Sequence, residues 1–153
     1  YIKNVLANAK MLAETLKNNG FKIYSGGTDT HLMLVDLWPF GVKGNIASES
    51  LCRANITCNK NGIPFDTEKP MITSGIRLGS QAATTRGFGL KEFEKVGELI
   101  TKVIKGLSKN PEDNSQIEEE VRKEVIDLCS SFPIYKNLNR WFVQYVRKVR
   151  PQL

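Results

Sequence analysis

The chain has 153 residues, 41% of them hydrophobic, and a formal net charge of +6. This length fits one globular domain, and no run of about 18 apolar residues is present to span a membrane. Five of the cations lie in residues 136–153, which contain no acid, so the remainder is close to neutral and lacks the basic surface of a nucleic-acid-binding protein. We therefore expect a cytoplasmic protein that binds no nucleic acid.

The three cysteines, Cys52, Cys58 and Cys129, are odd in number and show no Cys-x-x-Cys spacing. This pattern argues against a disulfide framework and against a zinc site. We predict free, buried thiols and no metal site, with Cys52 and Cys58 as small core residues rather than nucleophiles.

The first predicted element is an amphipathic helix that starts with the chain and ends at Asn19-Gly20, a typical helix stop. Its apolar residues recur at helical spacing: Ile2, Val5, Leu6, Ala9, Leu12, Ala13 and Leu16. The pattern begins without an N-cap or an initiator Met, which predicts a chain cut from a longer one.

Two strand-like runs follow, at residues 21–24 and 32–37. The connection between them, residues 25–30, contains a Gly-Gly pair that permits a tight turn. We predict a β-hairpin.

The next segment alternates between short elements and turns. After an apolar loop at residues 38–41, residues 46–54 predict a short helix and residues 56–58 a brief strand. The turn-forming residues of 59–64 predict irregular structure.

A further predicted strand, Met71 to Leu78, contains a single arginine, Arg77, among seven apolar or small residues. A guanidinium offers five donors in a planar fork and cannot lose its charge, so it is costly to bury without an acceptor. Two hypotheses follow: Arg77 forms an internal ion pair with Asp or Glu, or it binds the carboxylate of a small substrate.

Two amphipathic helices complete the pattern, at residues 90–108 and 117–129, separated by the turn-forming segment 110–114. The order is helix, strands, helix, strands, helices. It predicts an α+β fold of two layers, in which helices cover a small, mostly antiparallel sheet.

Several segments in register resemble serine hydroxymethyltransferase, a pyridoxal-phosphate enzyme also called glycine hydroxymethyltransferase. The matching segments are Ser25-Gly-Gly-Thr-Asp-Thr-His-Leu-Met-Leu-Val-Asp36, Arg53-Ala-Asn-Ile-Thr-Cys-Asn-Lys-Asn-Gly-Ile-Pro64, Thr73-Ser-Gly-Ile-Arg-Leu-Gly79 and Thr85-Arg-Gly-Phe88. Four ordered segments are more specific than any single motif. With the first helix and the segment ending at Tyr135, the resemblance covers residues 1–135.

The resemblance implies the small C-terminal domain of a fold-type I pyridoxal-phosphate enzyme. In that family the whole enzyme transfers a one-carbon unit between serine and tetrahydrofolate, giving glycine and methylenetetrahydrofolate, and is commonly a homodimer. Its cofactor lysine lies in a Thr-rich segment with His-Lys, which this sequence lacks, as it lacks a Gly-rich phosphate-binding loop. We therefore expect no catalytic or cofactor-binding residue here, and an isolated chain that is inactive.

The resemblance also assigns residues to ligands. Arg77 matches the arginine that binds the carboxylate of serine or glycine, and Asn61 matches a position that contacts folate, although Asn before Gly often just forms a turn. Lys60 and Arg86 are candidates for active-site or dimer contacts, with a structural ion pair as the alternative for Arg86. His31, the only histidine, is interpreted as structural.

Residues 136–153 extend past the expected end of the family domain and predict a basic amphipathic helical tail. Its apolar face comprises Leu138, Trp141, Phe142, Tyr145 and Val149. This face either packs on its own domain or docks on a partner, the missing domain or an anionic membrane surface. The alternative to an enzyme domain is therefore an interaction or regulatory module that binds a partner through this tail.

Overall fold

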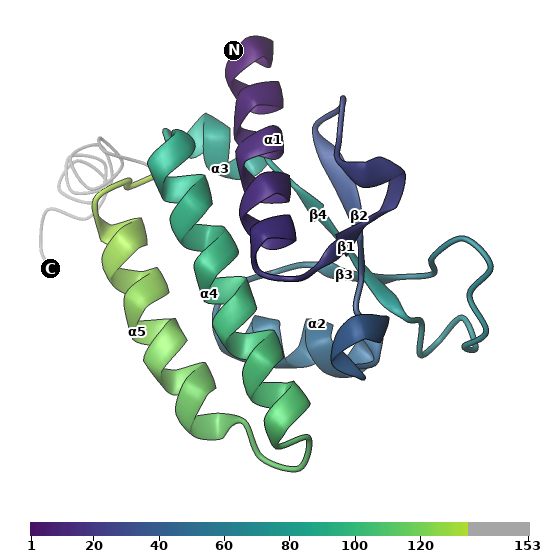
Figure 1. Ribbon diagram of the computed structural model, residues 1–153. Helices are drawn as coiled ribbons and strands as arrows, with labels where there is room; N and C mark the ends of the chain where they lie inside the picture. Colours follow the sequence, from purple (N-terminus) through teal and green to yellow (C-terminus); the bar gives the residue numbers. More distant parts are fainter. Residues whose placement is uncertain (135–153) are drawn as a thin grey trace, which may run out of the picture.

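A computed structural model describes residues 1–134 (Figure 1). Its helices are α1 (Ile2–Asn18), α2 (Gly44–Arg53), α3 (Gln81–Arg86), α4 (Leu90–Lys109) and α5 (Ser115–Ser130). Its strands are β1 (Lys22–Ile23), β2 (Leu32–Asp36), β3 (Asn59–Asn61) and β4 (Gly75–Gly79). The strands form one antiparallel sheet with the spatial order β1-β2-β4-β3.

The helices lie on one side of this sheet, so the predicted α+β architecture of two layers is confirmed (Figure 1). Helix α1 packs against α4, and α5 packs against α4 and α2. The opposite face of the sheet carries no α-helix within residues 1–134. The central strands β2 and β4 therefore bury the face toward the helices, whereas no residue of the edge strand β3 is fully buried.

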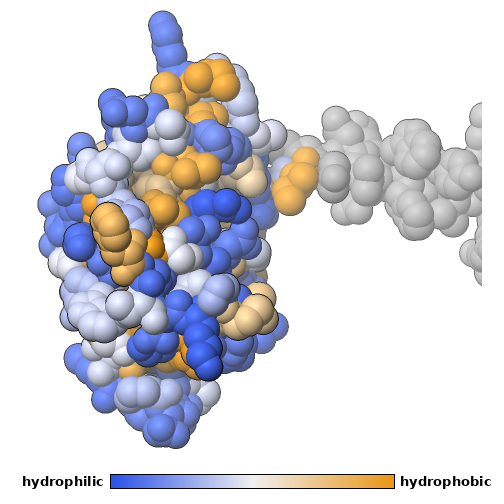
Figure 2. Space-filling model, turned by 90° about the vertical axis from the view of Figure 1, so that its right-hand side faces the viewer, coloured by the Kyte–Doolittle hydropathy of each residue, from blue (hydrophilic) through white to orange (hydrophobic). Residues whose placement is uncertain are grey.

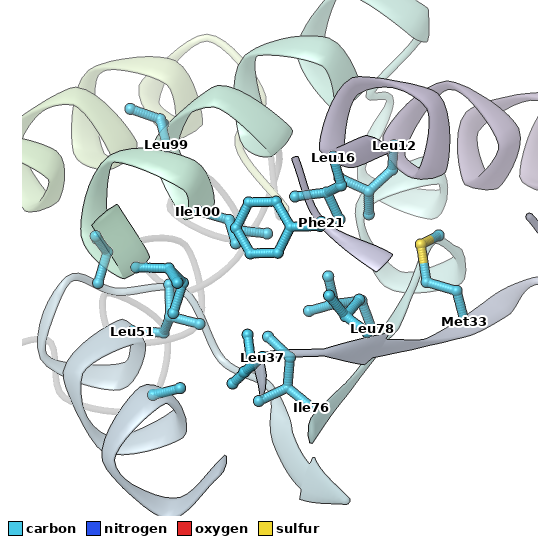
Figure 3. Close-up of a cluster of buried hydrophobic side chains, with 14 of the residues drawn as sticks. Leu12, Leu16, Phe21, Met33, Leu37, Leu51, Ile76, Leu78, Leu99 and Ile100 are labelled. Carbon is cyan, nitrogen blue, oxygen red and sulfur yellow. The ribbon is translucent and has the colours of Figure 1, made fainter. Parts of the chain in front are cut away.

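The core follows from the alternation of side chains along β2 and β4. Met33 and Val35 on β2 and Ile76 and Leu78 on β4 are buried against the helices. Figure 3 shows these strands facing side chains of the helical layer, and the labelled residues are Leu12, Leu16, Phe21, Met33, Leu37, Leu51, Ile76, Leu78, Leu99 and Ile100. Hydrophobic burial thus decides which face of the sheet meets the helices.

The predicted hairpin is confirmed, because β1 pairs with β2 in antiparallel register. The first helix ends as predicted: Gly20 has φ +95°, and the amide of Phe21 donates to the carbonyl of Leu16 at 3.0 Å. The predicted helices at residues 46–54, 90–108 and 117–129 correspond to α2, α4 and α5.

The predicted strand at residues 56–58 is wrong, and so is the irregular structure predicted for the start of 59–64. The strand is β3, which pairs with β4 through Asn59, Lys60 and Asn61. A polar edge strand of three residues has no hydrophobic alternation to predict it, and its pairing with β4 decides its conformation. Helix α3 was not predicted either.

Helix α5 is attached by polar contacts at both ends. Near its start, buried Glu118 accepts hydrogen bonds from Arg53 Nε at 2.6 Å, Arg53 Nη2 at 2.8 Å and Ser50 Oγ at 2.6 Å. The Arg53 guanidinium holds the pKa of Glu118 below its usual range. At its end, the carbonyls of Cys129 and Phe132 accept hydrogen bonds from Arg86 at 2.9 and 2.5 Å.

No helix within residues 1–134 is long and apolar enough to cross a membrane. The predicted helix at 136–153, and the boundary placed after residue 135, lie outside the described residues, so both stay predictions. Figure 2, viewed from the strand side, shows a mostly hydrophilic surface with separate hydrophobic spots. The exposed large apolar side chains include Phe65, Met71 and Trp38.

The close approach of α1 and α4 leads to a first prediction. A Cβ on buried Gly97 would lie 2.7 Å from Cγ2 and 2.9 Å from Cβ of Thr15. We expect Gly97→Val to lower the free energy of unfolding by about 1–3 kcal/mol, because the helices must move apart or the side chains must leave their rotamers. Chemical denaturation measures this change.

The matched control is Glu98→Val, at an exposed position of the same helix. It introduces the same β-branched residue without a steric conflict, so its cost should stay within about 0.5 kcal/mol. Equal costs for the two variants would show that the helix contact does not limit stability.

Candidate functional site

Arg77 lies in the middle of β4, on the face of the sheet opposite the helices. Its cross-strand partners are Leu34 on β2 and Asn59 on β3. Its side chain is exposed, whereas those of its neighbours Ile76 and Leu78 are buried. The sheet alternation places the arginine where a ligand has access to it.

The hypothesis of an internal ion pair for Arg77 is wrong for the part of the chain that the structure describes. No Asp or Glu within residues 1–134 forms a salt bridge with Arg77. The apolar neighbours Ile76 and Leu78 belong to the opposite face of the strand, whereas Met71 and Ile72 precede it. The arginine therefore keeps its donors available without being buried. The strand predicted at residues 71–78 starts too early, because β4 begins at Gly75.

Arg77 lines an open hollow of about 360 Å³ at the end of the sheet. The polar residues of its lining are His31, Thr57, Asn59, Arg77 and Gln81, and none of the lining residues within 1–134 is an acid. Among the lining residues within 1–134, the guanidinium of Arg77 is the one group that is charged at every accessible pH. Its chemistry suits a small anion, above all a carboxylate, which accepts two parallel hydrogen bonds from such a fork.

Asn61 lies at the end of β3 and pairs with Gly75. Because successive side chains alternate along a strand, Asn59 and Asn61 share the face of Arg77, about 7 Å apart along β3. The side-chain amide of Asn61 donates to the carbonyl of Gly62 at 2.8 Å, a local contact at the end of β3. It makes no other side-chain hydrogen bond within residues 1–134, so its carbonyl oxygen and second N–H are open to a ligand.

The loop from β3 to β4 is organised by the carboxylate of Asp66. It accepts hydrogen bonds from the amides of Ile63 at 3.1 Å, Glu68 at 2.9 Å and Ser74 at 2.9 Å, and from the Ser74 hydroxyl at 2.7 Å. Burial by itself would raise the pKa of Asp66, but these donors outweigh it and lower the pKa to about 2. The carboxylate of Asp66 therefore fixes the loop that connects the two strands of the site.

The other candidates, Lys60, Arg86 and His31, differ in their surroundings. Lys60 pairs with Ile76 and so lies on the opposite face of β3 from Asn61. Arg86 donates to backbone carbonyls at the end of α5, which is structural but not the ion pair considered as its alternative. The backbone carbonyl of His31 accepts from the amide of Ser80 at 2.9 Å, and its side chain lines the Arg77 hollow.

The prediction that Cys52 is a core residue is wrong, because its side chain is exposed on the outer side of α2. Cys58 is half-buried, and burial raises the pKa of its thiol to about 12. A thiol with that pKa is protonated near neutrality and is a poor nucleophile. No group of three His, Cys, Asp or Glu side chains within residues 1–134 is arranged to hold a metal ion.

The sequence alone did not single out Asn59, Thr57 or Gln81, which share the hollow with Arg77. Thr57 lies in the predicted brief strand at 56–58, and Asn59 lies in the segment 59–64 that was predicted to be irregular. No side-chain direction was therefore assigned to either residue. The spacing of two residues between Asn59 and Asn61 was the available signal, because strand residues at that spacing lie on one face.

The family model for serine hydroxymethyltransferase matches residues 1–100. A serine hydroxymethyltransferase from Pelagibacter ubique is 87% identical over 138 residues, 90% of this chain and 32% of the relative. Those of Marinomonas sp. and Colwellia psychrerythraea are 63% and 62% identical, over 89% and 88% of this chain and 32% and 31% of their own lengths.

The chain belongs to the serine hydroxymethyltransferase family. It spans about a third of the length of the curated relatives it matches. The family resemblance inferred from the sequence motifs is thus confirmed.

The family implies pyridoxal phosphate and tetrahydrofolate, and pyridoxal phosphate needs a lysine amine and a phosphate-binding loop. Among the described residues, 1–134, no lysine lines the Arg77 hollow. Lys10 and Lys17 line a larger hollow of about 620 Å³, but Lys17 donates to the Gly26 carbonyl at 2.6 Å and Lys10 lies 3.9 Å from Asp29. These residues do not fit the cofactor, and we assign no cofactor chemistry to them.

The Asp66 loop gives a second prediction. Asp66→Asn replaces a charged acceptor of four hydrogen bonds by an amide that brings its own N–H donors to them. We expect a loss of about 1–3 kcal/mol in the free energy of unfolding at pH 7. Urea denaturation measures it, with Asp127→Asn, on the exposed side of α5, as the control.

The pH dependence follows from the pKa. The pKa of Asp66 is about 2 in the folded chain against an ordinary value of 3.8, so its stabilisation is present above about pH 4 and is lost as the pH falls toward 2. The difference between the parent and Asp66→Asn should therefore shrink over this range. If the difference in free energy of unfolding between the parent and Asp66→Asn stayed constant from about pH 4 to about pH 2, the loss would come from altered hydrogen-bond geometry rather than from the charge of Asp66.

Proposed function

We propose that this chain is the substrate-binding C-terminal domain of a pyridoxal-phosphate-dependent enzyme. The whole enzyme transfers a hydroxymethyl unit between serine and tetrahydrofolate, giving glycine and methylenetetrahydrofolate. The observation that carries the proposal is the exposed Arg77, in a chain of this family, at a hollow whose lining contains no acid from residues 1–134.

Arg77 is proposed to bind the carboxylate of serine or glycine. Its planar fork donates two parallel hydrogen bonds to the two carboxylate oxygens, which fixes the position and the plane of the amino acid. A carboxylate held in this way presents its amino group and Cα in one orientation, which lowers the entropic cost of reaction.

Asn61 is proposed to bind the folate cosubstrate. The primary amide carries both donors and an acceptor, so it complements a polar pterin edge that presents both. Asn61 lies on the same face of the sheet as Arg77 and pairs with Gly75, two residues before Arg77 on β4. This position supports the assignment, because the two substrates must meet for one-carbon transfer.

The cofactor is then held mainly by a part of the protein outside this chain, and pyridoxal phosphate when bound there supplies the electron sink for the reaction. The inactivity of the isolated chain, the homodimer and the cytoplasmic location stay predictions. The alternative of a separate interaction module is not favoured by relatives that are all called serine hydroxymethyltransferase. A Thr-rich His-Lys segment encoded upstream would support the enzyme domain.

The third prediction concerns Arg77. We define the full-length enzyme as a chimera in which this chain replaces the segment that it matches in the Pelagibacter ubique relative. In it, Arg77→Ala should raise the Kd of glycine at least about 100-fold, because the carboxylate loses a charged bidentate partner. Arg77→Lys should recover only part of this affinity, since it keeps the charge and loses the fork. Calorimetry measures both.

Arg122→Ala is the control, because Arg122 is an exposed arginine of α5 near Glu119. It should leave the Kd of glycine unchanged. An Arg77→Ala variant that folds and binds glycine as the parent does would refute the carboxylate assignment.

The fourth prediction separates the two substrates. Asn61→Ala should weaken the binding of tetrahydrofolate by about tenfold, the effect of one lost hydrogen bond in a binding site. The Kd of glycine should change by less than about twofold. If only the affinity for glycine fell, Asn61 would be a binding residue for the amino acid and not for folate. If neither Kd changed, Asn61 would have only its structural role beside Gly62.

A further inference from the structure

The residue most closely coupled to Arg77 by the fold is Asn59. Within the antiparallel pairing of β3 and β4, Asn59 stands directly opposite Arg77. Side chains of directly opposed residues lie on the same face, with Cβ atoms about 4.5–5.5 Å apart. Both residues are exposed, and both line the same hollow.

The side chain of Asn59 is free to act on a ligand. No hydrogen bond joins its amide to another group of residues 1–134, whereas the amide of Asn61 already has a local partner. A structural asparagine in a turn normally hydrogen-bonds nearby backbone. Asn59 lies instead inside an edge strand and offers two N–H donors and one carbonyl oxygen to the hollow.

The chemistry of a carboxylate leaves a place for a second donor. Its two oxygens provide about four acceptor positions, of which a bidentate arginine uses two. A neutral amide beside the guanidinium adds a donor without adding a charge. Its carbonyl oxygen can at the same time accept a guanidinium N–H and restrict the rotation of the long arginine side chain.

We propose that Asn59 is a second binding residue of the carboxylate site, with its Nδ2 donating to the carboxylate that Arg77 holds. This inference rests on the proposed function, and it deepens that function by naming the residue that completes the recognition of the amino-acid substrate. Arg77 supplies charge and plane, and Asn59 supplies a directional contact from the neighbouring strand.

The test uses the full-length enzyme and measures the Kd of glycine by calorimetry for two substitutions. Asn59→Ala removes the donor and should raise the Kd about tenfold, as for one hydrogen bond to a charged group. Asn59→Asp places a carboxylate opposite Arg77, which competes with the ligand, and should raise the Kd about 100-fold or more. The Kd of tetrahydrofolate should change by less than about twofold in both variants.

Asn59→Asp tests whether position 59 lies beside the guanidinium, because a carboxylate there competes with glycine for Arg77. An Asn59→Asp variant that binds glycine as the parent does would contradict this placement. Asn18→Ala, on the exposed side of α1, is the control and should leave the Kd unchanged.

A double-mutant cycle completes the test. In an Arg77→Ala background the carboxylate is no longer held, so Asn59→Ala should cost less than about twofold there. An Asn59→Ala variant with the parent Kd, or one with equal losses in both backgrounds, would overturn the assignment of Asn59. Arg77→Ala with the parent Kd would instead refute the proposed function itself, so the two failures are distinguishable.

Discussion

The burial of one face of the sheet is the constraint on which the rest of the structure depends. The inward side chains of β2 and β4 are removed from water by α1, α2 and α4, and this apolar contact is the main source of stability in a domain of this size. Because strand side chains alternate, burial of Ile76 and Leu78 exposes Arg77 between them. A hydrophobic requirement on one side thus fixes the direction of a charged group on the other.

The sequence predicted those elements that carry their own periodic pattern. Helices α1, α4 and α5 have apolar stripes long enough to be recognised, and the hairpin of β1 and β2 is local. The elements that were missed depend on contacts distant in the chain. Strand β3 is polar and exists through its pairing with β4, and the six residues of α3 are too few to show a helical stripe.

The candidate site was predicted in part for the same reason. Arg77 was singled out by its place in a largely apolar run, and Asn61 through a family motif. The environment of Arg77 was not predicted, because a run of apolar residues does not show which of them share its face. Asn59 required knowledge of the register between two strands separated by a loop of 13 residues, 62–74. Cys52 was misplaced because its type favours burial, whereas α2 turns its position outward.

The attachment of α5 has a consequence for how the domain opens. Within this helix only Val121 and Glu118 are buried, and the two ends are held by the guanidinium groups of Arg53 and Arg86. A helix whose apolar side chains, apart from Val121, are only partly buried, and which is held by a few polar contacts, can detach as a unit at a lower free energy than the global core. Amide hydrogens of α5 should then exchange with solvent earlier than those of α4. Such an opening leaves the sheet, and the face that carries Arg77, in place.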